Sequence, residues 1–410
     1  MTRFAAFVRD NALWLGTGVL LTFLSSFGQT FFISVFAGAI RQDFGLSHGQ
    51  WGGLYASATT ASAVVMVFAG GLTDRLRVRW LGPMVIAGLA CAALAMAQVT
   101  AIWALGLAVF CLRLFGQGLM GHTAMVAMTR WFIATRGRAV GIAGLGVALG
   151  EALLPLTFVA LLGVFAWRSL WVGAALVLLA LAPLVFALMR QERTPQSYAA
   201  SEGATGMQGR NWTRVQVLRT PLFWLMVPAL MGPAAWGTAF FFHQVHLAEV
   251  KGWTHGTLVS LFPLYTVSAV VFLQIAGWLV DRFGSTRLMP VYLLPVAAGF
   301  CVFALARSPA MAALGMVLMG ASVGMNSTLN STLWAECFGT RHIGSIRAMI
   351  AAVMVLGTAI GPGLTGVLID SGIDYARQGW GVAAYFVLAS GLAWVAGRTV
   401  TGAAGTKAGV

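Results

Sequence analysis

The chain has 410 residues, of which 59% are hydrophobic and only 9% are charged. Soluble domains carry roughly 25% charged residues, so this composition excludes a cytosolic enzyme, a disordered chain and a secreted disulfide scaffold. The net charge of +14 would suit a nucleic-acid-binding protein, but most of the basic residues lie between apolar runs, and we predict no nucleic-acid partner.

Apolar runs of about 20 residues, the length that crosses a bilayer, recur along the whole chain. They predict an all-α, polytopic membrane protein with twelve transmembrane helices, at residues 13–37, 52–72, 80–99, 102–126, 139–163, 167–189, 221–245, 257–280, 288–306, 309–334, 345–369 and 379–399. The longest polar stretch follows the sixth run. The predicted domains are therefore a six-helix bundle at 1–189, a cytosolic linker at 190–220 and a second six-helix bundle at 221–410.

The basic residues are sorted by side of the membrane. With a cytosolic N-terminus, 19 of the 25 Lys and Arg fall on the cytosolic side, five fall outside, and Arg113 lies within a helix. Cytosolic loops of membrane proteins carry such an excess. We therefore predict an integral protein of a bacterial inner membrane, with both termini cytosolic and the lipid bilayer as its surroundings.

The two halves of the sequence repeat at a constant offset of 207 residues. Gly70, Asp74 and Arg75 recur as Gly277, Asp281 and Arg282, and the same offset pairs further Gly and Pro residues. Transporters are often built from such internal repeats.

The repeated segment resembles the loop signature of the major facilitator superfamily, in which Gly-x-Leu-x-Asp-Arg follows helices 2 and 8. The resemblance covers essentially the whole chain and implies a twelve-helix transporter. It also implies gating or conformational roles for Gly70, Asp74, Arg75, Gly277, Asp281 and Arg282, because an acidic group at a helix end can make a contact in one state and lose it in another.

A more local similarity, at 130–143 and 220–224, is to the monocarboxylate and oxalate–formate branch of that family. In that branch, cationic residues of the C-terminal half pair the substrate anion. Here the eighth predicted helix has only Gln274 as a strongly polar group, and the eleventh has no cation.

Two charged residues fall near the middle of predicted spans, Arg113 in the fourth helix and Glu151 in the fifth. Charges at this depth cost several kcal/mol and persist where they are paired or used. One interpretation is a fixed ion pair. The other is a competed pair, in which an anionic substrate takes Arg113 and leaves Glu151 to accept the coupling proton.

Other polar residues within spans are candidates for substrate contacts. Gln117 lies one turn from Arg113. A polar stripe on the first helix consists of Thr22, Ser25, Ser26 and Gln29, of which Ser26 and Gln29 are the candidates, and Asn326 and Asn330 share a face of the tenth. Packing contacts between helices are the alternative for each.

These features favour a secondary transporter, acting as a monomer, for a small-molecule substrate: a small organic anion, with a carboxylate moved by proton symport as the first choice. An exporter of amphiphilic or drug-like compounds is the alternative, and a sensor on the same scaffold is a third. Because the sequence has no clustered catalytic or metal-ligating residues, we expect no enzyme activity, no metal and no cofactor.

Overall fold

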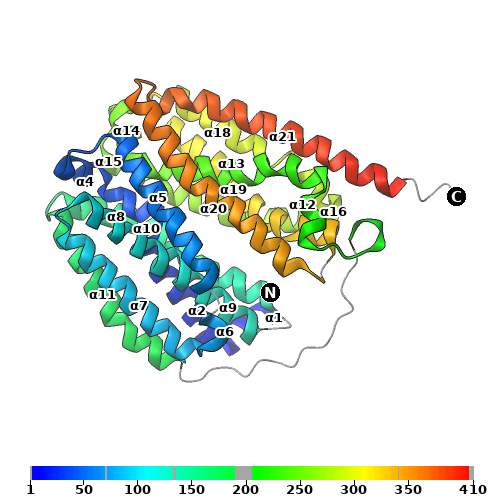
Figure 1. Cartoon of the computed structure of the whole chain (residues 1–410), viewed down its shortest axis with the longest axis horizontal. Helices are drawn as coiled ribbons and strands as arrows, with labels where there is room; N and C mark the ends of the chain where they lie inside the picture. Colours follow the sequence, from blue (N-terminus) through cyan, green and yellow to red (C-terminus); the bar gives the residue numbers. More distant parts are fainter. Residues whose placement is uncertain (1, 70–71, 133–134, 190–205, 340, 406–410) are drawn as a thin grey trace. The chain divides into compact units, whose positions relative to one another are not determined.

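A computed structural model describes residues 2–69, 72–132, 135–189, 206–339 and 341–405. Every regular element in these ranges is helical (Figure 1). The chain divides into two compact units, Met1–Ala199 and Ala200–Val410.

The first unit holds the elements of the N-terminal half. They are α1 (Thr2–Asp10), α2 (Ala12–Ser25), η1 (Ser26–Gly28), α3 (Thr30–Ile33), η2 (Ser34–Phe36), α4 (Ala37–Phe44), α5 (His48–Ala69), α6 (Leu72–Arg75), α7 (Val78–Gln98), α8 (Ile102–Leu112), η3 (Arg113–Met120), α9 (Gly121–Trp131), α10 (Arg136–Leu162) and α11 (Trp167–Leu188).

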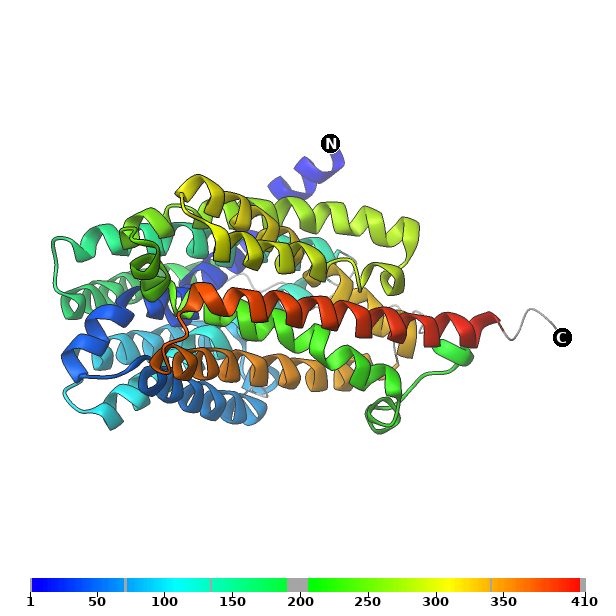
Figure 2. The same cartoon turned by 90° about the horizontal axis from the view of Figure 1, so that it is seen from above.

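The second unit repeats this pattern of long helices. Its elements are η5 (Met207–Gly209), α12 (Arg214–Leu218), α13 (Pro221–Phe242), α14 (Gln244–Lys251), α15 (His255–Val259), α16 (Phe262–Phe283), α17 (Ser285–Leu288), α18 (Leu293–Leu305), α19 (Pro309–Phe338), α20 (Ile343–Asp370) and α21 (Tyr375–Gly405). Within this unit α21 lies alongside α13 and α18 (Figures 1 and 2).

Ten helices in the described ranges are long and apolar enough to cross a membrane, and a bent pair, Ala12–Gly28 with Thr30–Phe44, makes eleven if it forms one span. The remaining predicted span, 52–72, corresponds to α5. This helix is 22 residues long but is not among the ten or eleven.

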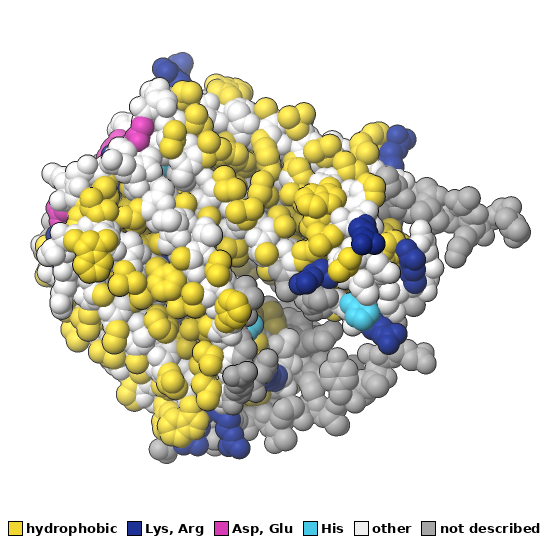
Figure 3. Space-filling model, in the orientation of Figure 1, with side chains coloured by type: hydrophobic (Ala, Val, Ile, Leu, Met, Phe, Trp, Pro, Cys, Tyr) yellow, Lys and Arg dark blue, Asp and Glu magenta, His cyan; other side chains and the backbone are white. Residues whose placement is uncertain are grey.

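Large apolar side chains are exposed along these helices, as expected where lipid is the solvent. Phe68, Trp103 and Leu388 are each at least 70% exposed. Figure 3 shows hydrophobic side chains covering much of the visible face.

Small residues bring α2 and α10 into close contact. A Cβ on Gly146 would lie 2.1 Å from both the Thr22 Oγ1 and the Val19 carbonyl oxygen, and a Cβ on Gly150 would lie 2.0 Å from the Ser26 Oγ. Thr22 also donates a hydrogen bond of 2.5 Å to the Ala143 carbonyl. Thr22 and Ser26 of the polar stripe are therefore buried in a helix–helix contact.

Three segments of the first unit are tied together at one end by the Arg168 side chain. Arg168 forms an ion pair with Asp43 at the end of α4 and donates a hydrogen bond of 3.2 Å to the Val99 carbonyl, which follows α7. Trp167 Nε1 also donates to Asp43 Oδ2, at 2.9 Å. This cluster fixes the ends of α4, α7 and α11 against one another.

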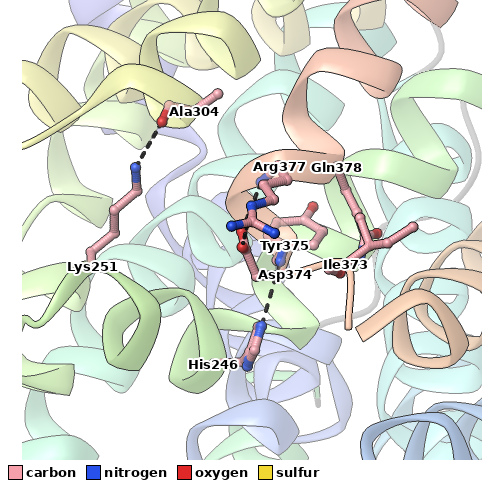
Figure 4. Close-up of polar contacts among 8 residues, drawn as sticks. All are labelled: His246, Lys251, Ala304, Ile373, Asp374, Tyr375, Arg377 and Gln378. Atoms are coloured by element: carbon pink, nitrogen blue, oxygen red, sulfur yellow. Dashed lines mark hydrogen bonds and ion pairs between the residues drawn. The ribbon is translucent and has the colours of Figure 1, made fainter. Parts of the chain in front are cut away.

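A similar tie in the second unit uses a different set of charges (Figure 4). The Lys251 Nζ donates to the Ala304 and Ala306 carbonyl oxygens, both at 3.0 Å, at the end of α18. Partial burial lowers the pKa of Lys251, and the nearby Asp374 carboxylate opposes that shift. Asp374 in turn pairs with Arg377, at 3.1 Å.

We predict that Gly146→Ala destabilises the protein, by about 1–3 kcal/mol, because the added methyl group forces α2 and α10 apart. Gly141→Ala on the same helix is the matched control, because a Cβ at that position meets nothing within 4 Å. The control should be neutral or stabilising by up to about 1 kcal/mol. Thermal unfolding of the purified variants checks the prediction, and equal midpoints for the two would contradict it.

Candidate functional site

The first membrane helix is broken next to a widened segment of the fourth. Gln29 has extended backbone angles (φ −83°, ψ 155°), and the helical pieces on either side are bent by 47°. Opposite the break, Arg113–Met120 forms a π-helix, a geometry that is frequent at functional sites.

Glycines allow these two irregular segments to touch. A Cβ on Gly28 would lie 2.1 Å from the Leu112 carbonyl oxygen, and a Cβ on Gly116 would lie 2.5 Å from the Gly28 Cα. Any larger side chain at either position would push the fourth helix away from the break. The low helix propensity of glycine also favours the irregular backbone here.

Arg113 is the first residue of the π-helical segment, and its side chain points into this junction. It is only 2% exposed. Its Nη1 donates to the Gly28 carbonyl oxygen and to the Thr30 Oγ1, both at the long distance of 3.3 Å, and its guanidinium lies 5.4 Å from the centroid of the Tyr55 ring. The hydroxyl groups of Thr30 and Tyr55 are 2.6 Å apart. The junction is thus a buried cation surrounded by a carbonyl, two hydroxyls and an aromatic face.

The guanidinium is incompletely satisfied. Its Nε is buried and has no hydrogen-bond partner in the part of the chain that the structure describes. The Glu151 carboxylate is not among the Arg113 contacts in those residues either; Glu151 lies half-buried on α10, next to the Gly150 that packs on Ser26. The structure therefore does not show the fixed Arg113–Glu151 ion pair, which was one of the two interpretations from sequence.

The remaining predicted substrate contacts of the first unit lie around this junction. Gln29 is half-buried at the break, and Gln117 is half-buried within the π-helical segment. Ser26 is buried against α10. Binding of substrate by these residues stays a prediction.

In the second unit, the predicted contacts of the tenth span bind each other. The Asn330 Nδ2 donates to the Asn326 Oδ1 at 2.6 Å, while the Asn330 Oδ1 is buried without a partner among the described residues. The aromatic run Phe240–Phe242 of α13 is buried, and Phe240 packs edge-on against Phe303.

The loop signature is described in one of its two copies. Gly70 and the side chains of Asp74 and Arg75 lie outside the described residues. In the second copy Asp281 and Arg282 are exposed, with the Arg282 guanidinium 5.5 Å from the Trp278 ring centroid, and a Cβ on Gly277 would meet nothing within 4 Å. Gly284 has φ +79°, a conformation that favours glycine, and ends α16. Gating by these residues also stays a prediction.

Two residues of the junction, Thr30 and Tyr55, were not predicted from sequence. Thr30 follows the polar stripe directly, so extending that stripe by one residue would have included it. Tyr55 gives no comparable signal, because it comes from a helix whose contact with Arg113 depends on tertiary packing. No group of three or more His, Cys, Asp or Glu that could hold a metal ion occurs in the described ranges.

Comparison with protein families identifies the class of protein that carries this junction. The model of the Major Facilitator Superfamily matches residues 18–362 and 244–408. The chain belongs to this superfamily, which is one of transporters and not of enzymes.

Individual relatives match less completely. The chain is similar to the Multidrug resistance protein B homolog of Mycobacterium tuberculosis, with 30% identity over 29% of this chain and 22% of that protein. It is also similar to the Probable transporter SCO4007 of Streptomyces coelicolor, with 27% identity over 48% of this chain and 53% of that protein. The matches thus span about a fifth to a half of these curated relatives.

Solved structures share the fold across nearly the whole chain. A bacterial homologue of the human lysosomal transporter Spinster, in an inward-facing and unoccupied conformation, matches with a TM-score of 0.71 at 16% identity, over 96% of this chain and 98% of that chain. The nucleoside transporter NupG matches with a TM-score of 0.64 at 14% identity, over 95% and 98%.

We predict that Arg113→Met makes the ligand-free protein more stable, because a buried cation that has no acidic partner among the described residues costs more than a buried apolar side chain of similar length. The expected gain is about 1–4 kcal/mol. Arg168→Met is the control with the opposite sign, since Arg168 pairs with Asp43, and it should lose about 1 kcal/mol. Thermal unfolding in detergent measures both, and a destabilised Arg113→Met variant would show that the cation serves the fold.

Proposed function

We propose that the protein is a secondary transporter that moves a small organic anion, and that Arg113 is the residue that binds the negative charge. The observation that carries the proposal is the burial of this guanidinium beside a helix break with its Nε unpartnered among the described residues. Broken helices at mid-membrane are a common place for substrate sites in secondary transporters.

The chemistry of the junction suits an anion. Neutral acceptors at 3.3 Å are weak partners for a buried cation, because N–H···O bonds usually measure about 2.7–3.2 Å. A carboxylate could accept two hydrogen bonds from the guanidinium at once and would supply the missing negative charge. Thr30 and Tyr55 could then donate their hydroxyl protons to the same group.

Glu151 is the proposed coupling acid. It lies on α10, one residue from a close contact with the first helix, so a movement of the broken helix would change its surroundings. A carboxyl group that moves between wetter and drier surroundings binds and releases a proton. We propose proton symport on this basis, in a monomer of the bacterial inner membrane with both termini cytosolic.

An exporter of amphiphilic compounds is the second candidate. It is favoured by the similarity of part of the chain to the Multidrug resistance protein B homolog. In that case the solute would be held mainly by apolar surface, and Arg113 would not be required for its charge. A non-transporting sensor would bind a ligand without any flux.

Arg113→Gln should abolish uptake of carboxylates by proteoliposomes, with a loss of at least about 100-fold, because a buried charge-assisted contact is worth several kcal/mol. Arg113→Lys should keep part of the activity, since it keeps the charge. Arg9→Gln, at an exposed arginine, is the control. A screen of radiolabelled carboxylates and amphiphiles decides the class: carboxylate uptake that survives Arg113→Gln contradicts the anion proposal, and flux of amphiphiles alone supports the exporter.

Glu151→Gln should separate proton coupling from substrate movement. The variant should still exchange internal for external substrate, but a pH gradient should no longer drive accumulation, because the amide cannot carry a proton. Counterflow and gradient-driven uptake measure the two processes. Gradient-driven accumulation at the wild-type level would exclude Glu151 as the coupling acid while leaving the role of Arg113 intact.

A further inference from the structure

The first unit has an open apolar groove between α7 and α8, and Arg113 is not among the residues that line it. Its volume is about 590 Å³. The sides include the exposed Cys91, Ala95, Trp103 and Leu107, and the buried Ala92 and Ala108 also line it.

The internal repeat explains why the helices are separated here. At the offset of 207 residues, Ala92 and Ala108 correspond to Gly299 and Gly315 on α18 and α19. In the second unit these glycines meet: a Cβ on Gly299 would lie 3.1 Å from the Gly315 carbonyl oxygen, and one on Gly315 would lie 3.3 Å from the Gly299 carbonyl oxygen. The two alanine methyl groups of the first unit occupy the space through which the backbones approach in the second.

The groove is closed at one end and polar at the other. Phe115 closes it next to Gly88, where a Cβ would lie 2.6 Å from the Phe115 ring. At the opposite end the exposed side chains of Gln98 and Thr100 line the mouth, and the partly exposed Arg168 donates to the Val99 carbonyl there. An amphiphile with one polar end matches this arrangement.

The length of the groove selects among apolar occupants. Gly88 and Gln98 are separated by ten residues of α7, or about 15 Å at 1.5 Å per residue. This is half of the roughly 30 Å hydrocarbon core, the depth of one leaflet. A partner transmembrane helix would need a groove along the whole span, whereas a single acyl chain needs one leaflet only.

We propose that this groove binds one acyl chain of a membrane phospholipid, with the headgroup at Gln98, Thr100 and Arg168. The chain lies against Ala92 and Ala108 and ends at Phe115. Arg168 adds N–H donors for the lipid phosphate while it stays paired with Asp43. The lipid would bind by the wall of one bundle and is separate from the solute proposed at Arg113.

Repeat-matched variants test the proposal in liposomes that contain phosphatidylcholine with a photoreactive diazirine in its acyl chain. In the wild type, crosslinks should concentrate on peptides from residues 88–115. The double variant Cys91→Phe with Ala95→Phe fills the groove and should reduce these crosslinks about tenfold. The control Ala298→Phe with Val302→Phe introduces two phenylalanines at the corresponding positions of α18 and should leave these crosslinks unchanged. Equal crosslinking of residues 88–115 in both variants would overturn the proposal.

Native cysteines allow a second measurement without any change in the groove. Cys91 and Cys111 line it, whereas Cys301 on α18 does not. Adding dioleoylphosphatidylcholine to the detergent-purified wild type should slow N-ethylmaleimide alkylation of Cys91 and Cys111 but not of Cys301. If all three rates change alike, the lipid coats the surface without occupying the groove, and the proposal fails.

Discussion

The buried Arg113 guanidinium is the constraint around which the first unit is arranged. A cation inside a membrane protein must be given polar partners, because the surrounding hydrocarbon supplies none. Here those partners come from a break in the first helix, which frees the Gly28 carbonyl, and from the adjacent Thr30 hydroxyl. The break in the first helix and the π-helical segment of the fourth helix therefore together accommodate the buried guanidinium.

Close helix contacts make this arrangement of the first and fourth helices possible. Gly28 and Gly116 let the broken helix meet the π-helical segment, and Gly146 and Gly150 hold the first helix against α10. In lipid such small residues replace the hydrophobic driving force that packs soluble helices. The first helix is thus held from two sides, while the guanidinium between its neighbours lacks an acidic partner in the described part of the chain. Close helix contacts and a cation without an acidic partner among the described residues agree with the anion site that we propose.

Much of the fold could be predicted from the sequence because it follows from hydrophobic length. The all-helical membrane architecture is confirmed, and most predicted spans fall on observed helices to within a few residues. The second predicted span falls on α5, which is not among the helices counted as long and apolar enough to cross a membrane in the described residues. The break at Gln29 was not predicted, because an apolar run has the same composition whether it is straight or bent.

The site was harder to predict because contacts between helices are not encoded in local periodicity. Arg113 stood out as an intramembrane charge, and the structure places it in a polar junction. Its partners Thr30 and Tyr55 come from different helices, so only the packing brings them together. The polar stripe of the first helix shows the same limit, since Thr22 and Ser26 proved to be buried against α10.

The ties at the ends of the two bundles bear on how the repeat evolved. Val99 and Ala306 occupy corresponding positions, 207 residues apart, and each offers its carbonyl oxygen to a cation. In the first unit that cation is Arg168, at the start of α11, and its acidic partner Asp43 is on α4. In the second unit it is Lys251, at the end of α14, and the nearby acid Asp374 directly precedes α21. Between the two units, the cation and the acid thus come from different helices, while the carbonyl oxygen that accepts the hydrogen bond stays at the corresponding position. The repeat thus keeps the place of the interaction and not its residues, so the correspondence of the two ties shows in the backbone acceptor and would escape a search for identical side chains.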